Sequence, residues 1–338
     1  MGNTGLRVSA IAQGSTSNAY RKMIFDKNEE MTRESISNLD SLWNNVKTYR
    51  SSETYKKIME ACARFKHLAP YNALLVEVQK PGAMYVLSAK DWYRGYQRKI
   101  KPNARPLIIL VPFGPVEYVF DIADTYPGAP ALFHDSDDDI LEKIAAPYKT
   151  KKDVSDKLLA DIIDQLKYHG IAVENNFIAG PDFGAQIELL LDDSHIINFI
   201  RRNDILKWRA EYLLSVNSNA KNGQRFASIC HELGHLFCHH LPSPKEWKPW
   251  NRRNITHAAK EFEAESVSWL VCERLGIGNP SEAYLSNYLT KNQTIPDETS
   301  IERILSATKE ILELCEPPKI THKKGLLYKR CERFKQTW

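Results

Sequence analysis

The five residues His231-Glu232-Leu233-Gly234-His235 constrain the fold of this 338-residue chain more than any other segment. In an α-helix, residues four positions apart lie about 40° apart around the axis, so both imidazoles project from one face. An apolar stripe at helical spacing runs through the same segment and consists of Phe226, Ile229, Cys230, Leu233 and Phe237. The pattern predicts a helix over 223–241 that is buried along one stripe and presents two paired histidines.

Two imidazoles on one helix face are suited to holding a metal ion, Zn²⁺ above all, because zinc accepts histidine nitrogen in tetrahedral geometry. Glu232 follows the first histidine by about 100°, beside the open coordination position, where it can take a proton from zinc-bound water. The same pattern also arises by accident, since ten histidines in a chain of this length give a random match in about one chain in fifty. A zinc site therefore requires a third ligand elsewhere.

Three glutamates in the next predicted helix, 258–275, are candidates for that ligand. Glu261 and Glu265 lie about 40° apart on a face that is otherwise small and apolar. Either one can ligate zinc while the other orients a histidine through its free ring N–H, and geometry favours Glu261 as the ligand and Glu265 as the outer partner. Glu263 lies about 200° from Glu261, so we expect it on a solvated face beside a basic neighbour.

The motifs HELGH at 231–235 and EFEAES at 261–266 resemble the ImmA/IrrE-type zinc metallopeptidase domain, within the gluzincin-like group, over about 210–276. The resemblance implies that Glu261 is the metal ligand, because the family's ligand precedes the alanine of the second motif by three residues. It also implies a zincin-like fold whose edge strand, to which peptide substrates add, matches Tyr212–Asn217. The implied activity is zinc-dependent hydrolysis of peptide bonds in a protein substrate, with Glu232 activating the water and a repressor-like transcriptional regulator as one candidate substrate.

The N-terminal half is similar to the single-stranded-DNA-binding domain of ArdC-type antirestriction proteins. That similarity is carried by Tyr71–Leu75, by Met84–Ser88 with Trp92, and by Val119–Ile122. It implies single-stranded DNA as a partner. The sequence departs from the family at the segment 99–105, which stands where the family usually has a glycine-rich turn.

The basic, aromatic-rich segment 91–105 has two interpretations. In the first, it binds nucleic acid through base stacking and phosphate contacts, with the candidate residues Trp92, Arg94, Arg98, Lys99 and Lys101. In the second, the aromatic rings are half-buried and the charges form an ordinary solvated face. The tail 318–338 has seven Lys or Arg against one Glu, and it too is either a nucleic-acid arm or a solvated terminus.

Periodicity predicts an α+β chain of two domains, a small α+β N-terminal domain and a zincin-like domain with a short sheet and active-site helices. The expected organisation is a disordered N-terminus over 1–20, an ArdC-like domain over 21–150, a metallopeptidase domain over 151–317 and a basic tail over 318–338. The first domain begins with a helical region over 21–66 and continues with strands at 85–87, 107–111 and 116–122. The second has a helix at 154–168, strands at 186–191 and 210–216, and helices at 223–241, 258–275, 281–289 and 298–315.

Composition excludes several classes of protein. The most apolar stretch, 106–113, is far shorter than the roughly 20 residues of a membrane-spanning helix, so we expect no membrane association. Six scattered cysteines without a CxxC pair, and no secretion signal, predict a cytoplasmic protein with reduced thiols.

Besides an endopeptidase, two hypotheses remain: a nucleic-acid-binding antirestriction or mobile-element protein whose zinc is structural, and a switch that cleaves one repressor-like partner. Glu232 separates the endopeptidase and the switch from the nucleic-acid-binding protein, because a structural zinc needs no general base.

Overall fold

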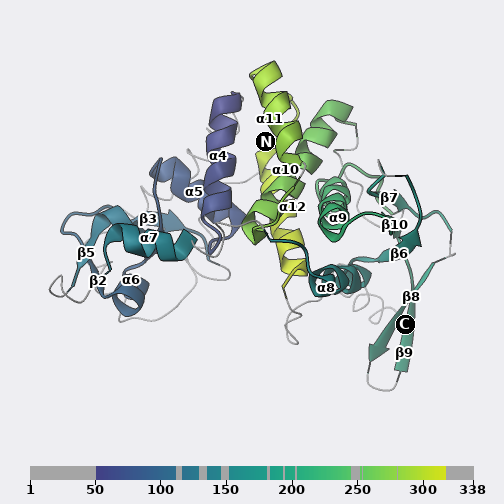
Figure 1. Cartoon of the computed structure of the whole chain (residues 1–338), viewed down its shortest axis with the longest axis horizontal. Helices are drawn as coiled ribbons and strands as arrows, with labels where there is room; N and C mark the ends of the chain where they lie inside the picture. The colour runs from purple at the N-terminus through teal and green to yellow at the C-terminus, as the bar shows by residue number, and fades with distance from the viewer. Residues whose placement is uncertain are drawn as a thin grey trace. The chain divides into compact units, whose positions relative to one another are not determined.

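The computed structural model describes residues 51–111, 116–128, 135–145, 152–180, 183–192, 195–201, 204–244, 252, 254–279 and 281–316. The chain divides into two compact units, Met1–Lys149 and Thr150–Trp338. Both combine helices with small sheets (Figure 1), so the chain has a mixed α+β fold. The predicted disordered segment 1–20, the first part of the predicted helical region (21–50) and the basic tail 318–338 lie outside the described residues.

The first unit contains a three-stranded antiparallel sheet in the order β1-β4-β3 and a separate two-stranded ladder of β2 with β5. Three of the strands lie where short apolar runs predicted them, whereas β2 and β5 were not predicted. The strands are β1 (Val86–Ser88), β2 (Arg98–Ile100), β3 (Leu107–Ile109), β4 (Glu117–Asp121) and β5 (Thr125–Pro127). The helices of this unit are α4 (Ser52–Arg64), α5 (Pro70–Gln79), α6 (Ala89–Tyr96) and α7 (Asp137–Ala145).

Helix α5 covers the outer edge of β3 with two side-chain amides. Pro70 occupies the first turn of the helix, where its missing N–H costs nothing. Asn72 exchanges two hydrogen bonds with the backbone of Leu110, at 2.8 and 3.0 Å. Gln79 does the same with the backbone of Ile108, at 2.9 Å in both directions. These amides satisfy backbone groups that an edge strand would otherwise leave unpaired.

The sheet of the second unit has the order β6-β10-β7, from β6 (Ile171–Phe177), β10 (Tyr212–Asn217) and β7 (Ala185–Leu189). Strand β10 pairs with β6 in parallel and with β7 antiparallel. The expectation that Tyr212–Asn217 is an edge strand is therefore wrong. Its almost continuous apolar sequence is typical of a central strand buried on both faces, and it is buried at every position except Ser215. No described strand pairs with the outer side of β7, which leaves β7 as an edge.

Five helices accompany this sheet: α8 (Asp156–Leu166), α9 (Asn222–Phe237), α10 (His257–Leu275), α11 (Ser281–Asn292) and α12 (Ile301–Leu314). Helix α9 packs on β7 and β10 on one side and on α10 and α12 on the other. The hydroxyl of Thr256 caps the start of α10, and Gly276 ends this helix in the left-handed conformation at a φ of 72°. Helix α9 is thus fixed between a sheet and two helices, which gives side chains on it a rigid support.

Two strands that the sequence did not indicate, β8 (Ile196–Arg201) and β9 (Asp204–Arg209), form an antiparallel hairpin. In Figure 1 this hairpin projects away from the β6-β10-β7 sheet. No helix in the described part of the chain is long and apolar enough to cross a bilayer.

Candidate metal centre

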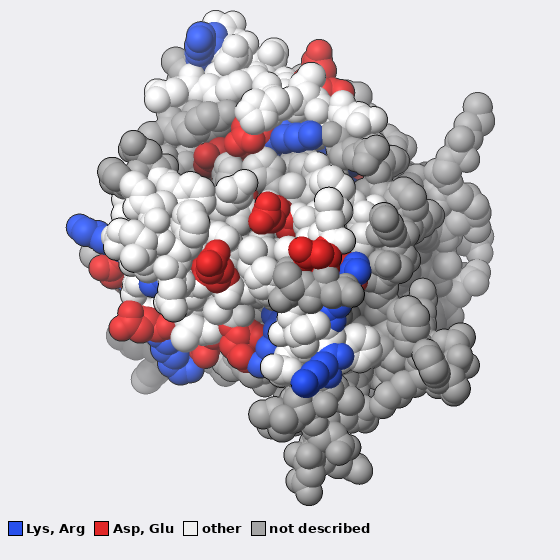
Figure 2. Space-filling model, turned by 90° about the vertical axis from the view of Figure 1, so that its right-hand side faces the viewer, with Lys and Arg blue, Asp and Glu red and all other residues white. Residues whose placement is uncertain are grey.

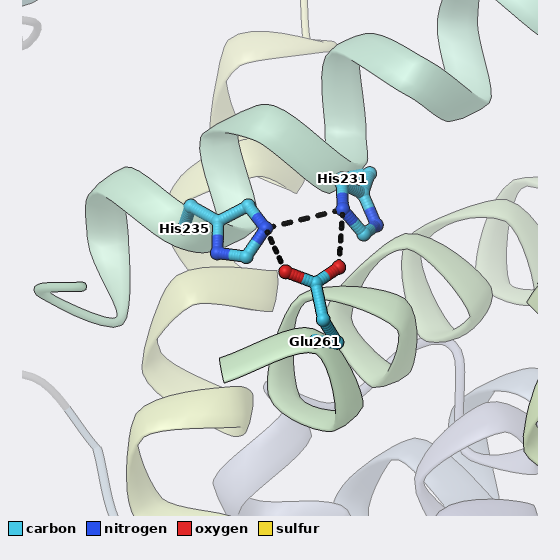
Figure 3. A group of neighbouring side chains, drawn as sticks. All are labelled: His231, His235 and Glu261. Atoms are coloured by element: carbon cyan, nitrogen blue, oxygen red, sulfur yellow. Dashed lines mark hydrogen bonds and ion pairs between the residues drawn. The ribbon is translucent and has the colours of Figure 1, made fainter. Parts of the chain in front are cut away.

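His231 and His235 lie one turn apart on α9 and direct their Nε2 atoms toward each other, 3.1 Å apart (Figure 3). Both side chains are mostly buried, with 19 and 13% exposed. The flanking apolar residues of α9 that predicted this helix are buried, which orients the histidine face toward α10. Two imidazole nitrogens therefore converge on one point between the two helices.

Glu261 reaches the same point from α10, as Figure 3 shows. One carboxylate oxygen lies 3.5 Å from His231 Nε2, and the other lies 3.4 Å from His235 Nε2. In a tetrahedron with zinc–ligand bonds of about 2.0–2.1 Å, the ligands are about 3.3–3.4 Å from each other. The three observed separations bracket that value, so the donor set and its spacing fit a tetrahedral metal ion with one open position. These residues form a group that can bind a metal ion.

Gly234 allows the two helices to come close enough for this geometry. A Cβ built on Gly234 would lie 3.0 Å from the Cα of Ala264 and 3.2 Å from its carbonyl oxygen. Ala264 is itself small and fully buried, and it lies between Glu261 and Glu265 along α10. The two small residues meet at the crossing, so the acidic face of α10 packs directly over the histidine face of α9.

Each histidine has a second partner at its outer nitrogen. Glu265 Oε1 lies 3.4 Å from His231 Nδ1, on the side away from Glu261. His240 Nδ1 lies 2.9 Å from His235 Nδ1. A partner at the outer nitrogen fixes the ring orientation and leaves Nε2 directed at the metal position.

Glu263 does not lie on a solvated face, so that expectation is wrong. Its side chain is completely buried, and Arg252 donates to both carboxylate oxygens at 2.6 Å. His240 Nε2 and the backbone N–H of Ser300 complete its contacts, at 2.9 and 2.6 Å. Burial alone would raise the pKa of Glu263, but the hydrogen bonds from Arg252 and His240 lower it below its ordinary value. The basic partner of Glu263 is thus Arg252, which lies outside the motifs at 231–235 and 261–266.

Glu232 points from α9 to the edge strand β7, where its Oε2 accepts a hydrogen bond of 3.0 Å from the N–H of Ile187. Burial raises the pKa of this carboxyl to about 7, against the lowering effects of His231 and of the Ile187 N–H. A carboxyl with a pKa near neutrality can both accept and release a proton at physiological pH. Glu232 is therefore suited to general acid–base chemistry beside the histidine pair.

The pKa values of the histidines and of Glu261 in this cluster shift in different directions. Burial lowers the pKa of His231, but the carboxylates of Glu261 and Glu265 outweigh burial and raise this pKa to about 10. Burial and the neighbouring charge of His231 lower the pKa of His235 to about 3. The hydrogen bond from His231 lowers the pKa of Glu261. A proton on His231 thus compensates the carboxylate charge at the position that a metal cation would take.

The remaining histidines and cysteines near the motif do not enter the triad. The side chain of His257 is 86% exposed at the start of α10, although its Nδ1 lies 3.6 Å from Glu261. Burial raises the pKa of Cys238 well above its ordinary value, so this residue is a neutral thiol. Cys230 and Cys272 lie in the core.

The structure overturns two of the five nucleic-acid candidates in the first unit. Trp92 is fully buried, and its indole N–H donates to the carbonyl of Phe120 at 2.7 Å, so it cannot stack on a base. Arg98 is 2% exposed and binds Asp137 at 2.7 Å and the hydroxyl of Thr125 at 2.6 Å. Its charge is satisfied inside the protein and cannot contact phosphate.

The other three candidates are exposed and lie on α6 and around β2. They are Arg94, Lys99 and Lys101. Lys101 also donates to the carbonyl of Ala123 at 2.7 Å. Figure 2 shows a different face, the one on the right-hand side of Figure 1, and Lys and Arg form no continuous field in its described part.

Nothing in the sequence indicated that Arg252 belongs to this site. Arg252 lies outside any periodic segment, so no pattern of spacing connects it with Glu263.

Comparisons of the chain with protein-family models, with curated proteins and with solved structures each found no match. The chemistry of the site therefore has to be inferred from its own residues.

Proposed function

We propose that the second unit is a zinc-dependent endopeptidase that hydrolyses peptide bonds of a protein substrate. The observation that carries this proposal is the position of Glu232, which follows a member of a triad with the spacing of a tetrahedral metal site and whose carboxylate reaches the edge strand β7. A zinc site that only stabilises the fold has four protein ligands and needs no base. Here three candidate ligands converge, and Glu232, the residue after His231, is a carboxyl that interacts electrostatically with His231 and Glu261.

The proposed residues have distinct roles. A zinc ion held by His231, His235 and Glu261 would supply a Lewis acid that polarises a peptide carbonyl and acidifies water. Glu232 accepts the proton of the attacking water at its carboxylate and returns it to the leaving amide nitrogen as the C–N bond breaks. Glu265 holds the ring of His231 through Nδ1.

The edge strand β7 is the proposed binding surface for the peptide. The hydrogen bonds from Asn217 N to Gly184 O and from Leu190 N to Glu211 O fix the alternation of the β7–β10 ladder. In that alternation Ile187, opposite Leu214, belongs to a non-hydrogen-bonded pair, so its N–H and C=O point away from β10. A peptide that adds to β7 as a further strand can use these groups and would pass beside Glu232.

Position 184 supports the same arrangement, because β7 approaches α9 so closely at its start that only glycine fits. A Cβ on Gly184 would overlap with the hydroxyl oxygen and the Cβ of Ser228 on α9. The distance between the edge strand and the helix that carries Glu232 is thus fixed by direct contact. The proposed substrate surface and the proposed catalytic helix form one rigid assembly.

The variant Glu232→Gln tests this function. We expect it to keep the fold and to bind zinc with the affinity of the wild type, because a general base is lost and no ligand is changed. The zinc-loaded wild type should cut members of an unbiased peptide library, read out by mass spectrometry, and the variant should cut none. Zinc binding by both proteins without cleavage by either would indicate a structural zinc instead. Retained turnover by the variant would remove Glu232 from the mechanism.

The resemblance to ImmA/IrrE-type domains suggests a repressor-like regulator as the substrate. The Glu232→Gln variant should then retain the uncut protein. A captured regulator that the zinc-loaded wild type also cleaves in purified form would identify the substrate. Reduced thiols suit a cytoplasmic location, and the described cysteines are thiols outside disulfides.

A second candidate function, binding of single-stranded nucleic acid by the first unit, is supported by one feature of the β2–β5 ladder. Lys99 and Tyr126 are paired across the two strands and are both exposed. An exposed ring beside an exposed cation suits base stacking with a phosphate contact. The full chain should bind single-stranded DNA at 50 mM salt, and the triple variant Arg94→Gln, Lys99→Gln, Lys101→Gln should weaken this binding. Absence of binding at low salt would exclude this function.

A further inference from the structure

A chain of four buried polar side chains runs from the metal position into the protein. It consists of His235, His240, Glu263 and Arg252, with contacts of 2.9, 2.9 and 2.6 Å between successive members. The side chain of His240 is 1% exposed, that of Glu263 is completely buried, and that of Arg252 is 13% exposed. Such a chain is costly to bury unless every member is satisfied, so its hydrogen bonds determine where the protons lie.

The carboxylate of Glu263 determines the direction of these hydrogen bonds. Its Oε1 accepts from Arg252 and from the N–H of Ser300, and its Oε2 accepts from Arg252 and from His240 Nε2. A carboxylate beside a guanidinium is ionised and can only accept, so Nε2 of His240 carries a proton. In the neutral ring the other nitrogen, Nδ1, is then a bare acceptor.

The tautomer of His240 fixes that of His235 in turn. Because His240 Nδ1 is an acceptor, His235 must donate to it from its own Nδ1–H. The lone pair of His235 is then left on Nε2, which is the nitrogen that faces His231 and Glu261. The arrangement holds His235 in the only neutral form that can ligate a metal through Nε2.

A turn in the left-handed conformation brings His240 to this position. His239 has a φ of 66°, directly after the end of α9. The chain folds back there, so that the N–H of His240 donates to the carbonyl of His235 at 2.9 Å. His240 therefore contacts His235 through both its backbone and its ring.

A second metal ion is the alternative occupant of this region, since Cys238, His240 and Glu263 also lie within reach of one ion. Three observations count against it. Four donors already occupy the carboxylate of Glu263, the guanidinium of Arg252 supplies the positive charge, and Nδ1 of His240 is bound to His235. The neutral, buried thiol of Cys238 is a poor ligand as well.

We propose that His240, held by Glu263 and Arg252, is a positioning residue that fixes the tautomer and orientation of His235 for metal binding. This inference rests on the metal site of the proposed function. It adds a residue outside both sequence motifs on which the metal affinity depends. Outer partners of this kind contribute roughly 10–100-fold to metal affinity.

Two matched substitutions in the full chain distinguish the role of His240 Nδ1 from that of His240 Nε2. In His240→Asn the amide oxygen can replace Nδ1 as acceptor for His235, and in His240→Gln the amide nitrogen can replace Nε2 as donor to Glu263. We expect His240→Gln to lower zinc affinity by roughly 10–100-fold and His240→Asn to lower it less, measured by competition with a chromophoric chelator. The visible spectrum of the cobalt-substituted protein should change more for Gln than for Asn. The control His239→Asn removes the neighbouring imidazole and should leave zinc affinity unchanged.

Several outcomes would overturn the proposal. Equal zinc affinity in the wild type and both His240 variants would do so, as would a larger loss for Asn than for Gln. Two zinc ions per wild-type chain, falling to one in Cys238→Ala, would assign the region to a second metal. If the wild type binds no zinc at all, both this proposal and the proposed function fail. Zinc binding without proteolysis affects the proposed function alone.

A measurement on the wild type avoids variants that fail to fold. The ring ¹⁵N chemical shifts of the zinc-loaded protein distinguish the two neutral tautomers of each histidine. We expect a proton on Nε2 of His240 and on Nδ1 of His235. A proton on Nδ1 of His240 would contradict the proposal directly.

Discussion

Gly234 on α9 and Ala264 on α10 touch so closely that a Cβ on Gly234 would lie 3.0 Å from the Ala264 Cα. The contact is with the backbone of a buried helix, which cannot move aside as the end of a flexible side chain could. The separation between the two helices, and with it the distance from the histidines to Glu261, is set at this point. The glycine of the HELGH motif therefore serves the metal geometry without touching the metal position.

Replacement of Gly234 by alanine should push α9 and α10 apart. We expect Gly234→Ala to lower the free energy of unfolding by about 1–3 kcal/mol, as overpacking of a core does, and to weaken zinc binding. Urea denaturation in the presence of a chelator and a separate zinc titration measure the two effects. The matched control is Gly223→Ala on the same helix, where the added Cβ would meet nothing closer than 3.7 Å. That control should stabilise the protein by about 0.5–1 kcal/mol. A harmless Gly234→Ala would mean that the helices can separate freely.

Zinc uptake should release a proton. His231 has a pKa of about 10 in the histidine–glutamate cluster, so at pH 8 it is protonated, and it must be neutral to ligate a metal. We expect about one proton to be released per zinc ion at pH 8. Calorimetric titration of the apoprotein in buffers of different ionisation enthalpy measures this number. The variant His231→Ala should take up no zinc and release no proton. Zinc binding without proton release would show that His231 is already neutral.

Glu263 and Glu265 should differ in how much they contribute to stability in the absence of metal. Glu263→Ala leaves Arg252 and His240 without their partner, so we expect it to cost about 3–5 kcal/mol of unfolding free energy even in the presence of a chelator. Glu265→Ala should change stability little in the chelator but should lower zinc affinity by roughly 10–100-fold. Denaturation and zinc competition on both variants test this. The opposite ranking of the two variants in stability would contradict the structure of the buried network.

The adjacent cations Arg98 and Lys99 should also differ. Arg98 is buried against Asp137 and Thr125, and Lys99 is exposed. We expect Arg98→Gln to destabilise the protein by about 2–3 kcal/mol, since hydrogen bonds of a charged group are lost in the interior. Lys99→Gln should change stability by less than about 0.5 kcal/mol. Thermal unfolding of the full chain compares them. Equal stability of the two variants would indicate that the contacts of Arg98 contribute nothing.

The parts of the site that the sequence predicted are those that helical geometry alone determines. Residues 231, 235, 261 and 265 each take their direction from the spacing within one helix, which does not depend on the rest of the chain. The environment of Glu263 depends instead on Arg252 and on the turn at His239, neither of which belongs to a periodic segment. Burial of Arg98 depends on Asp137, which follows it by 39 positions and starts another helix. Contacts of this kind arise from tertiary packing, and local patterns do not contain them.

The sheet differed from expectation for a related reason. The apolar sequence of Tyr212–Asn217 predicted a strand correctly, but it does not specify how many neighbours the strand has. The second neighbour, β6, is rich in polar residues toward its C-terminal end and showed no strand pattern. Its parallel pairing with β10 places β10 in the centre of the sheet and leaves β7 as an edge strand.

The hydrogen bond between Glu232 and Ile187 has a consequence for the order of events at the edge of the sheet. The outward N–H of Ile187 is the donor that any strand arriving at β7 needs, and Glu232 already occupies it. An arriving strand must therefore take this donor from the carboxylate. Docking of the strand and release of Glu232 are therefore one event, in which a backbone carbonyl of the arriving strand replaces the carboxylate as acceptor. With no strand in place, the same contact pairs one outward-directed donor of an edge that could otherwise join to the sheet of another molecule.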